Sequence, residues 1–210
     1  VMAATAGLRP SLAEVSTFVH GTTLGLNAIL QRRGADIGLI TNAGFEDILE
    51  VARADVPARR MYDFTYAPPP PLARRRHRLG VAGRIDVTGS ELVPLDEAAV
   101  VDAAQKLVDR GLTSLAICFL HSYANPGHEE RAAELIRARF PDVSVSVSTE
   151  LSREYREYER TSTACVDAYI RPILRDYLGD LGRRLEDAAF TGSFHVMRSG
   201  GGAMTSEVAR

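Results

Sequence analysis

The stretch "STFVHGTTLGLNAILQRRGADIGLITNAGFEDILEVAR", Ser16 to Arg53, decides the fold class. It begins with an apolar segment, "STFVH", which we predict to be a buried strand that ends at Gly21. A helix with one apolar face follows; Thr22 or Thr23 is placed to cap it, and Gly34 is placed to end it. A second apolar strand, "DIGLITN", and a second helix, "FEDILEVAR", come next after short connections. Strands that alternate with helices in this way indicate an α/β layer in which neighbouring strands run parallel.

The overall composition is that of a globular protein without an unusual partner. The 210 residues are 45% hydrophobic and 25% charged, which is enough to bury a core. The formal charge of −2 argues against nucleic acid or an anionic membrane as the main partner. No apolar run approaches the roughly 20 residues that span a bilayer, and we find no signal peptide. Cys118 and Cys165 have no paired spacing, so we expect buried free thiols and a cytoplasmic location.

The middle of the chain changes character and then returns to regular elements. Residues 54–80 show no periodicity and contain Pro68–Pro71, so we predict a long exposed excursion. Its arginine cluster, Arg74–Arg78, is interpreted as a solvated arm or a subunit contact. A hairpin around "TGS" and a helix from Glu97 to Arg110, capped by Asp96, should follow.

The last third of the chain predicts two strands, a helix between them, and then one long helix. "SLAICFLHS" is typical of a fully buried strand, and "VSVSVS" of a half-buried one. Residues 154–188 carry an apolar stripe at helical spacing, and Pro172 should kink or divide that helix. "FHVM" is expected to be a short strand, followed by a glycine loop that leads into a new helix.

The first candidate site is the turn formed by His20, Gly21, Thr22 and Thr23. It follows a strand and opens a helix, and ligands of open α/β sheets bind at that edge. An imidazole and two hydroxyls there suit a phosphate or a carbonyl oxygen. The simpler interpretation is a capped turn whose histidine donates to a backbone carbonyl, and spacing alone favours it.

Three further segments have both a functional and a structural interpretation. "RSGGGAM", Arg198–Met204, lets a backbone approach a ligand or serves as an interdomain hinge, and it matches neither common phosphate fingerprint. "EYERTST", Glu157–Thr163, has three consecutive hydroxyl residues in a helix, which indicates close packing or binding. His121 and His128 lie seven residues apart across a Pro–Gly turn, which is a poor spacing for a metal site, so we predict no metal ligands.

Five segments in order carry a resemblance to a known family. They are "HGTTLGLNAILQRRGADIGLITNAGFEDILEVAR", "LVPLDEAAV", "AICFLHSYANPGHE", "SREYREYERTSTACVDAYIRP" and "VMRSGGGAMTS". Over almost the whole chain they resemble the A-type subunit of the ATP-dependent hydantoinase/oxoprolinase family. The resemblance implies an α/β lobe of the actin/sugar-kinase/heat-shock ATPase type (ribonuclease H-like), incomplete at its N-terminus, with a hairpin-bearing insertion. It also implies an N-terminal family region over residues 1–190, which contains the excursion, and the start of the next domain at 191–210.

The activity that the resemblance implies is carbonyl activation by ATP. N-methylhydantoinase, 5-oxoprolinase and the ketone carboxylases phosphorylate an unreactive carbonyl oxygen and then allow attack on the carbon. We therefore expect part of an ATP-dependent hydrolase of cyclic amides, which uses ATP and Mg²⁺ and assembles with a B-type subunit or as a homo-oligomer. A subunit of the acetone carboxylase type and a non-catalytic binding or scaffold domain remain alternatives.

The resemblance also names pocket candidates, without a catalytic residue among them. They are His20, Gly21, Thr22, Thr23, Asn27, Arg160, Thr161, Gly200, Gly201 and Gly202. The Asp–x–Gly–Gly–Thr phosphate-binding hairpin of the family is absent from this sequence, so we expect the chain alone not to hydrolyse ATP. Gly200 stands where the family more often has Asn after the serine, which weakens a hydrogen-bonding role at that position.

Overall fold

A computed structural model describes residues 11–54, 56–198 and 200–206. The chain forms two compact units. The first unit combines residues 1–34 with residues 170–210, and the second comprises residues 35–169. Helix α7 (Glu157–Asp187) belongs partly to each unit, so the polypeptide passes between them once before β2 and once within this helix.

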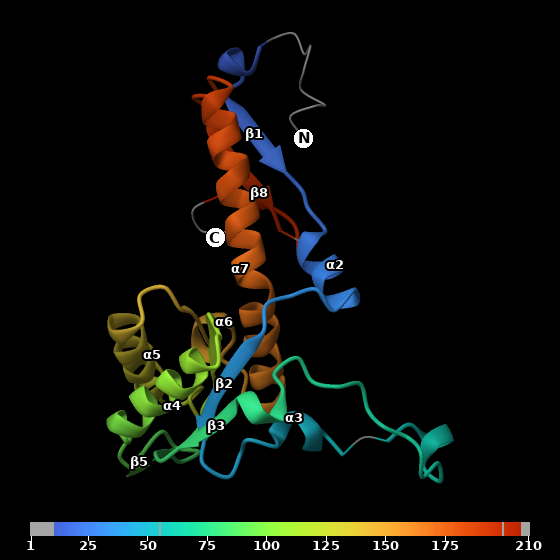
Figure 1. The fold of residues 1–210 in the computed structure, drawn as a ribbon, viewed down its shortest axis with the longest axis vertical. Helices are drawn as coiled ribbons and strands as arrows, with labels where there is room; N and C mark the ends of the chain where they lie inside the picture. Colours follow the sequence, from blue (N-terminus) through green and yellow to red (C-terminus); the bar gives the residue numbers. More distant parts are fainter. Residues whose placement is uncertain (1–10, 55, 199, 207–210) are drawn as a thin grey trace. The chain divides into compact units, whose positions relative to one another are not determined.

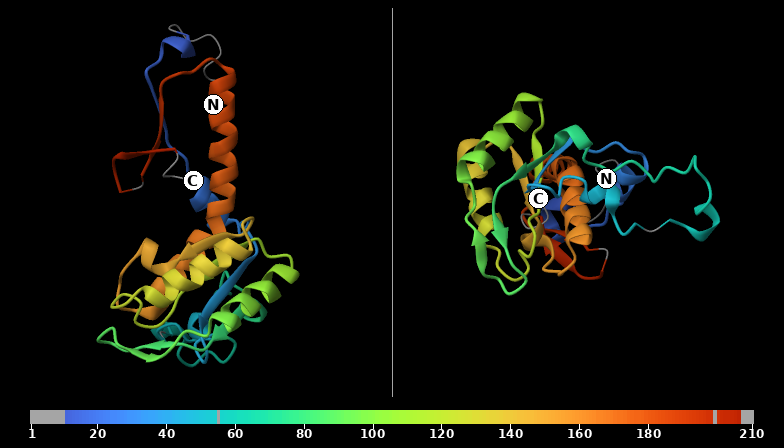
Figure 2. Two further views of the ribbon diagram at one scale, coloured as in Figure 1. Left: turned by 90° about the vertical axis from the view of Figure 1, so that its left-hand side faces the viewer. Right: turned by 90° about the horizontal axis from the view of Figure 1, so that it is seen from below.

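The second unit is built on a four-stranded parallel sheet with strand order β3-β2-β6-β7. The strands are β2 (Ile37–Asn42), β3 (Arg78–Val81), β6 (Ser114–Ile117) and β7 (Ser144–Val147). Helices α4 (Glu97–Asp109) and α5 (Gly127–Arg139) pack on one face of this sheet, as Figures 1 and 2 show. The fully buried strand predicted from Ser114 onward is confirmed, whereas the segment predicted as a half-buried strand forms β7, which is mostly buried.

The two faces of this sheet have different chemistry, which follows from the two-residue period of its strands. Toward α4 and α5 the strands place aliphatic residues such as Leu115, Ile117 and Val147 in the main hydrophobic core. In β6 and β7 the alternate positions are serine or alanine, and Ser114 and Ser146 bond to α7. Ser146 Oγ donates to Asp167 Oδ2 at 2.6 Å. Small side chains let α7 approach the sheet closely, which accounts for the hydroxyl-rich start of this helix.

Local signals set the ends of α4. Asp96 Oδ1 accepts from Ala99 N at 2.9 Å, so the predicted cap is confirmed. Gly111 follows the helix with φ of +82°, a value that a glycine adopts without strain. Close packing of α4 requires a second glycine, since a Cβ on Gly38 would lie 2.8 Å from Leu107.

The excursion between β2 and β3 is exposed over most of its length, but its two ends differ from the prediction. The predicted helix "FEDILEVAR" is reduced to α3 (Ile48–Val51), because Ala52 and Ala54 adopt positive φ and end it. The arginine cluster is not wholly solvated. Arg78 is only 2% exposed, because its guanidinium donates to Ala73 O and pairs with Glu50. Beyond β3, strands β4 (Arg84–Ile85) and β5 (Glu91–Val93) form the predicted hairpin.

The first unit contains a separate three-stranded sheet with order β1-β8-β9. Its strands are β1 (Thr17–His20), β8 (Ser193–Met197) and β9 (Ala203–Thr205). Strand β1 pairs in parallel with β8, with Thr17 opposite Ser193 and His20 opposite Val196, and Figure 1 shows the two side by side. The alternation of strands and helices implied that β1 and β2 share a sheet, but the two strands belong to different sheets. Strand β1 is also half-exposed rather than buried, because only Phe18 and His20 face inward.

Helix α2 (Leu24–Leu30) follows β1 and does not end at Gly34. Arg32 takes the left-handed conformation, with φ of +54°. Arg33 N donates to Ala28 O at 2.9 Å and Arg32 N to Ile29 O at 3.2 Å, which is the hydrogen-bond pattern of a Schellman motif. The prediction that Gly34 ends this helix was wrong, because the Schellman motif ends it with Arg32 as the left-handed residue, two positions before that glycine.

The glycine loop after β8 forms a hairpin turn instead of leading into a helix. Gly201 and Gly202 have φ of +92° and +78°, and Arg198 N donates to Gly202 O at 3.0 Å. The turn joins β8 to β9 in antiparallel pairing, with Met197 opposite Ala203. Two adjacent residues with positive φ suit a tight hairpin turn, and glycine adopts that conformation without strain.

Helix α7 continues through Pro172, so the expected division at this residue is wrong. Proline has no N–H, and the carbonyl of Ala168, four residues earlier, therefore lacks its helical donor. Ser114 Oγ on β6 donates to this carbonyl at 2.7 Å, and both serine and alanine are fully buried. A side chain of the sheet thus replaces the hydrogen bond that proline removes.

We predict that Ser114→Ala lowers the free energy of unfolding by about 1–3 kcal/mol, because it leaves a buried carbonyl without a donor. In a Pro172→Ala background the same substitution should cost less, since the introduced alanine would supply a backbone N–H to that carbonyl. Urea unfolding of the four proteins of this double-mutant cycle measures the coupling. Equal losses in both backgrounds would show that the serine does not compensate for the proline.

Candidate functional site

The edge formed by the carboxyl ends of β2 and β6 is the first place to look for a ligand in the second unit. In the strand order the chain continues from β2 to β3 in one direction and from β6 to β7 in the opposite direction. Open α/β sheets bind ligands at such a switch point. Here the two strand ends are joined by protein groups. Asn42 Oδ1 accepts from Leu120 N at 2.7 Å, and Asn42 Nδ2 donates to Gly83 O at 2.7 Å.

A buried ion pair fills the neighbouring part of this edge. Glu129 and Arg160 have no exposed side-chain surface, and Arg160 Nη1 lies 3.4 Å from Glu129 Oε1. The carboxylate also accepts from Phe119 N at 2.7 Å and from Thr149 N at 3.0 Å. The guanidinium donates to Phe119 O at 2.5 Å and to Ser148 Oγ at 2.8 Å. The pair therefore joins α5 and α7 to the segments that follow β6 and β7, and most of its polar atoms have protein partners.

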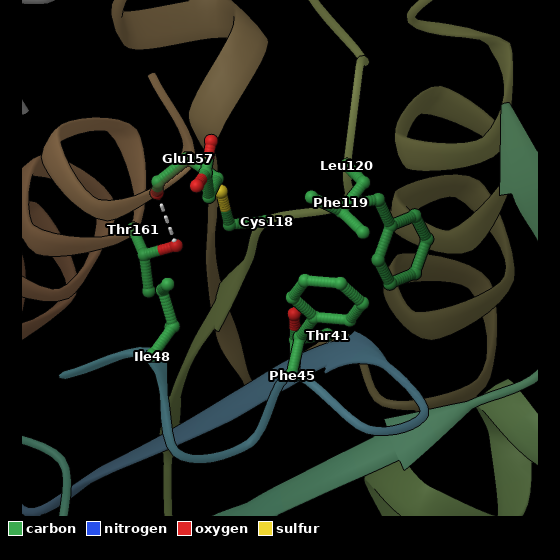
Figure 3. Close-up of a pocket in the computed structure, with 8 residues that line it drawn as sticks. All are labelled: Thr41, Phe45, Ile48, Cys118, Phe119, Leu120, Glu157 and Thr161. Atoms are coloured by element: carbon green, nitrogen blue, oxygen red, sulfur yellow. Dashed lines mark hydrogen bonds between the residues drawn. The ribbon is translucent and has the colours of Figure 1, made fainter. Parts of the chain in front are cut away.

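Only a small cavity remains at the switch point, shown in Figure 3. Its volume is about 10 Å³, the space of one water molecule, and its polar lining includes Thr41, Glu157 and Thr161. Thr161 Oγ1 is occupied, since it donates to Glu157 O at 2.7 Å. Burial raises the pKa of the Cys118 thiol to about 11, so this cysteine is not a nucleophile at neutral pH. The cavity is too small for a substrate.

The first unit, in contrast, has an open groove at the carboxyl ends of its two parallel strands. Its volume is about 610 Å³, within the range of small-molecule sites. The walls are mainly aliphatic and come from α2, the second half of α7 and the β8–β9 hairpin. The residues that line it are Thr22, Thr23, Gly25, Leu26, Ile29, Ile170, Leu174, Leu178, Val196, Met197, Arg198, Gly200 and Met204.

The polar groups of the groove suit a ligand with acceptor oxygens. Thr22 Oγ1 accepts from Leu24 N at 3.1 Å, and Thr23 Oγ1 accepts from Asn27 Nδ2 at 3.2 Å. Each hydroxyl is thus used internally as an acceptor, which leaves its O–H to donate to a ligand. Arg198 adds a guanidinium from the other strand end. Helix α2 has only seven residues, so the arrangement depends on these side chains rather than on a helix dipole.

His20 lies beside the groove and is held by protein contacts. Its Nε2 lies 2.9 Å from the Tyr177 hydroxyl of α7, and its ring stacks at 6.5 Å from that of Phe18. Partial burial lowers the pKa of His20, so the ring is neutral at pH 7. Because the folded pKa lies below the unfolded value, the stability from the neutral ring is complete above that unfolded value and declines as the pH falls below it. Its partner is a tyrosine hydroxyl, not the backbone carbonyl that the simpler interpretation named.

The structure brings together some of the predicted pocket residues and separates others. Thr22, Thr23 and Gly200 line one groove, and Asn27 holds Thr23 from the next turn of α2. Gly21, Gly201 and Gly202 belong to the turns at the ends of β1 and β8. Arg160 and Thr161 belong to the second unit and are 1% and 2% exposed, so Arg160 is a buried structural group rather than a pocket wall.

Neither a metal cluster nor a membrane-spanning helix is present among the residues that the structure describes. No three His, Cys, Asp or Glu side chains are grouped there as metal ligands would be. His128 is buried and lies 3.1 Å from Glu91 Oε2, a pairing that sequence reasoning did not foresee. Across residues 11–54, 56–198 and 200–206, no helix combines the length and apolar character needed to cross a bilayer.

Comparison with known proteins places the chain in a family. The model of the hydantoinase/oxoprolinase N-terminal region matches residues 2–140, and the hydantoinase/oxoprolinase model matches residues 160–210. The chain belongs to the hydantoinase/oxoprolinase family, so the resemblance seen in the sequence is confirmed.

Individual relatives have different names within this family. The chain is 36% identical to caprolactamase subunit alpha of Pseudomonas jessenii over 95% of its own length, and 30% identical to the acetone carboxylase beta subunit of Xanthobacter autotrophicus over 94%. It spans 29% of each of those proteins. Among solved structures, ATP-dependent caprolactamase from P. jessenii matches 98% of this chain and 30% of its own, with a TM-score of 0.87 and 35% identity. A nucleotide-free structure of acetone carboxylase matches 99% of this chain and 31% of its own, with a TM-score of 0.81 and 29% identity. These matches establish a mixed α/β fold with a parallel sheet.

Glu129 is the structural residue that sequence reasoning missed. It lies in the first turn of α5, where an acidic residue is ordinary, and its neighbour Glu130 is exposed. We predict that Glu129→Ala lowers the free energy of unfolding by about 3–5 kcal/mol, because it leaves the Arg160 charge buried and unpaired. Glu130→Ala, the matched control, should change it by less than about 0.5 kcal/mol. Urea denaturation compares the two, and similar small losses would show that the pair does not hold the unit together.

Proposed function

We propose that this chain is part of the A-type subunit of an ATP-dependent hydrolase of cyclic amides. The whole protein would phosphorylate the carbonyl oxygen of the ring amide and so turn that oxygen into a leaving group for attack on the carbon. Family membership supports this class, since relatives are named caprolactamase and 5-oxoprolinase. Because the chain spans less than a third of the relatives described above, the activity is proposed for the whole protein.

The observation that carries the proposal is the groove of the first unit. It joins the carboxyl ends of β1 and β8, where Thr22 and Thr23 offer O–H donors and Arg198 offers a positive charge. Aliphatic walls suit the methylene groups of a cyclic amide. The donors suit its carbonyl oxygen or the phosphate that replaces it. The second unit has a smaller hollow of about 340 Å³ beside Arg53 and Tyr155, but its lining is mainly polar and includes the ion pair of Arg53 with Glu159, and the switch point of that unit is filled.

The cofactors proposed for the whole protein are ATP and Mg²⁺, and this chain fits them unequally. Threonine hydroxyls and an arginine are suitable phosphate contacts. No carboxylate is among the residues that line the groove, whereas Mg²⁺ in proteins is held by carboxylates together with phosphate oxygens. The groove residues therefore do not fit the metal. When bound, ATP would supply the phosphoryl group, and this chain would orient the carbonyl oxygen of the cyclic amide that accepts it.

The remaining proposals concern architecture and assembly. We propose a lobe of the actin/sugar-kinase/heat-shock ATPase type, with the next domain beginning near residue 191. We also propose a B-type subunit as partner, and relatives named as subunits support a multi-chain assembly. The buried free thiols of Cys118 and Cys165 support a cytoplasmic location.

The test uses the full-length protein that contains this chain, purified with its B-type partner. We predict ATP consumption that depends on a cyclic amide, measured with caprolactam, hydantoin and 5-oxoproline as candidates. Acetone is included as the ketone substrate of the carboxylase alternative. Thr22→Val and Thr23→Val should each reduce kcat/KM by about tenfold, which corresponds to about 1.4 kcal/mol for one lost hydrogen bond to the reacting oxygen.

Thr17→Val is the matched control, because Thr17 is exposed on β1, the strand that precedes the turn, and is not among the residues that line the groove. It should leave kcat/KM unchanged. Consumption with acetone alone would favour the carboxylase alternative. Unchanged kinetics in both groove variants would contradict the proposed site, and no ATP consumption with any candidate would contradict the activity.

A further inference from the structure

The excursion between β2 and β3 is longer than the sheet requires. A parallel crossover needs about 10–12 residues including its helix, whereas β2 ends at Asn42 and β3 begins at Arg78. Much of the extra length reaches away from the sheet of the second unit, as Figures 1 and 2 show. Long ordered insertions that do not build the core are usually functional.

Three large apolar or aromatic side chains in this excursion are exposed to solvent. Met61 is 61% exposed, Tyr62 is 86% exposed and Phe64 is 102% exposed, and we name these three residues the aromatic tip. Tyrosine, phenylalanine and methionine are enriched in protein interfaces. A cluster of such exposed side chains in four residues of sequence is unfavourable in water unless another surface covers it.

The aromatic tip is held in shape by polar contacts of its own. Asp63 Oδ1 accepts from Thr65 N at 3.0 Å and from Thr65 Oγ1 at 2.6 Å, and Asp63 Oδ2 accepts from Arg60 Nη1 at 2.6 Å. These bonds lower the pKa of Asp63. Asp63 lies between Tyr62 and Phe64 in the sequence, so its contacts constrain the segment that carries the two exposed rings. Such preorganisation reduces the entropy lost when a loop binds.

Charge indicates the chemistry of the partner surface. Residues 53–78 contain seven arginines and two aspartates, although the whole chain has a formal charge of −2. Several arginines near the base are paired within the second unit, among them Arg75 with Asp47 and Arg53 with Glu159. At the tip Arg60 is paired with Asp63, and Arg59 adds a positive charge next to that pair in the sequence. An apolar pocket with an acidic rim would complement this arrangement.

We propose that the aromatic tip inserts into an apolar, acid-rimmed pocket on the B-type partner subunit and anchors the assembly of the two chains. This inference depends on the proposed function, which supplies the partner. Tyr62 and Phe64 fill the pocket, and Asp63 keeps them in the binding conformation. Three relatives that each match more than 90% of this chain are named as subunits, which favours a separate chain over a distant part of the same polypeptide.

The experiment measures the dissociation constant between the full-length protein and the purified B-type subunit by biolayer interferometry. The double variant Tyr62→Ser/Phe64→Ser should weaken binding at least thirtyfold, and Asp63→Ala several-fold. Tyr155→Ser is the matched control, because Tyr155 is an exposed aromatic residue outside the excursion, and it should have no effect. Circular dichroism and thermal melting should be unchanged in all variants.

Two results would overturn the inference while the proposed function stands. One is a wild-type complex that consumes ATP with a cyclic amide, together with a double variant that binds the B-type subunit as tightly as the wild type does. The other is loss of self-association in the double variant with unchanged binding of the B-type subunit, which would identify a second copy as the occupant. If the wild-type chains neither bind nor consume ATP, the proposed function itself fails.

Discussion

The buried pair of Glu129 and Arg160 is the constraint on which the second unit depends. Removing two charges from water is costly, and here the cost is offset because nearly every polar atom of the pair has a protein partner. The two residues come from α5 and α7, and their partners lie in the segments that directly follow β6 and β7. The pair therefore fixes where β6 and β7 end and where α5 and α7 begin, in a region that aliphatic packing alone would leave less specific.

The same pair fills the edge of the second unit at which open α/β sheets usually bind ligands. A parallel sheet normally offers the edge at its carboxyl ends, and the second unit uses that edge for its own stability. The first unit leaves the corresponding edge open, with hydroxyl and guanidinium groups on aliphatic walls. The groove that we propose as the ligand site and the buried ion pair thus lie at the carboxyl ends of parallel strands in two different sheets.

Sequence reasoning predicted the elements whose signals are local. The cap at Asp96, the buried strand through Leu115 and the hairpin around Gly89 are encoded within a few residues each. The pairing of β1 with β8 could not be predicted, because it joins segments from opposite ends of the chain. Glu129 also gave no signal of its own, since an acidic residue in a first helical turn is ordinary until β7 and α7 enclose it. Among the groove residues, Thr22, Thr23 and Gly200 were predicted, whereas the aliphatic wall from α7 was not, and Arg160 was assigned to the pocket only by resemblance.

The most direct measurement is hydrogen–deuterium exchange of the full-length protein with and without ATP, Mg²⁺ and a cyclic amide. If the groove binds the ligand, backbone amides near Thr22 and Gly200 exchange more slowly in its presence, because both strand ends contact it. If exchange there is unchanged and slows instead around Phe119 and Arg160, the ligand binds at the edge that we describe as filled, and the account is wrong.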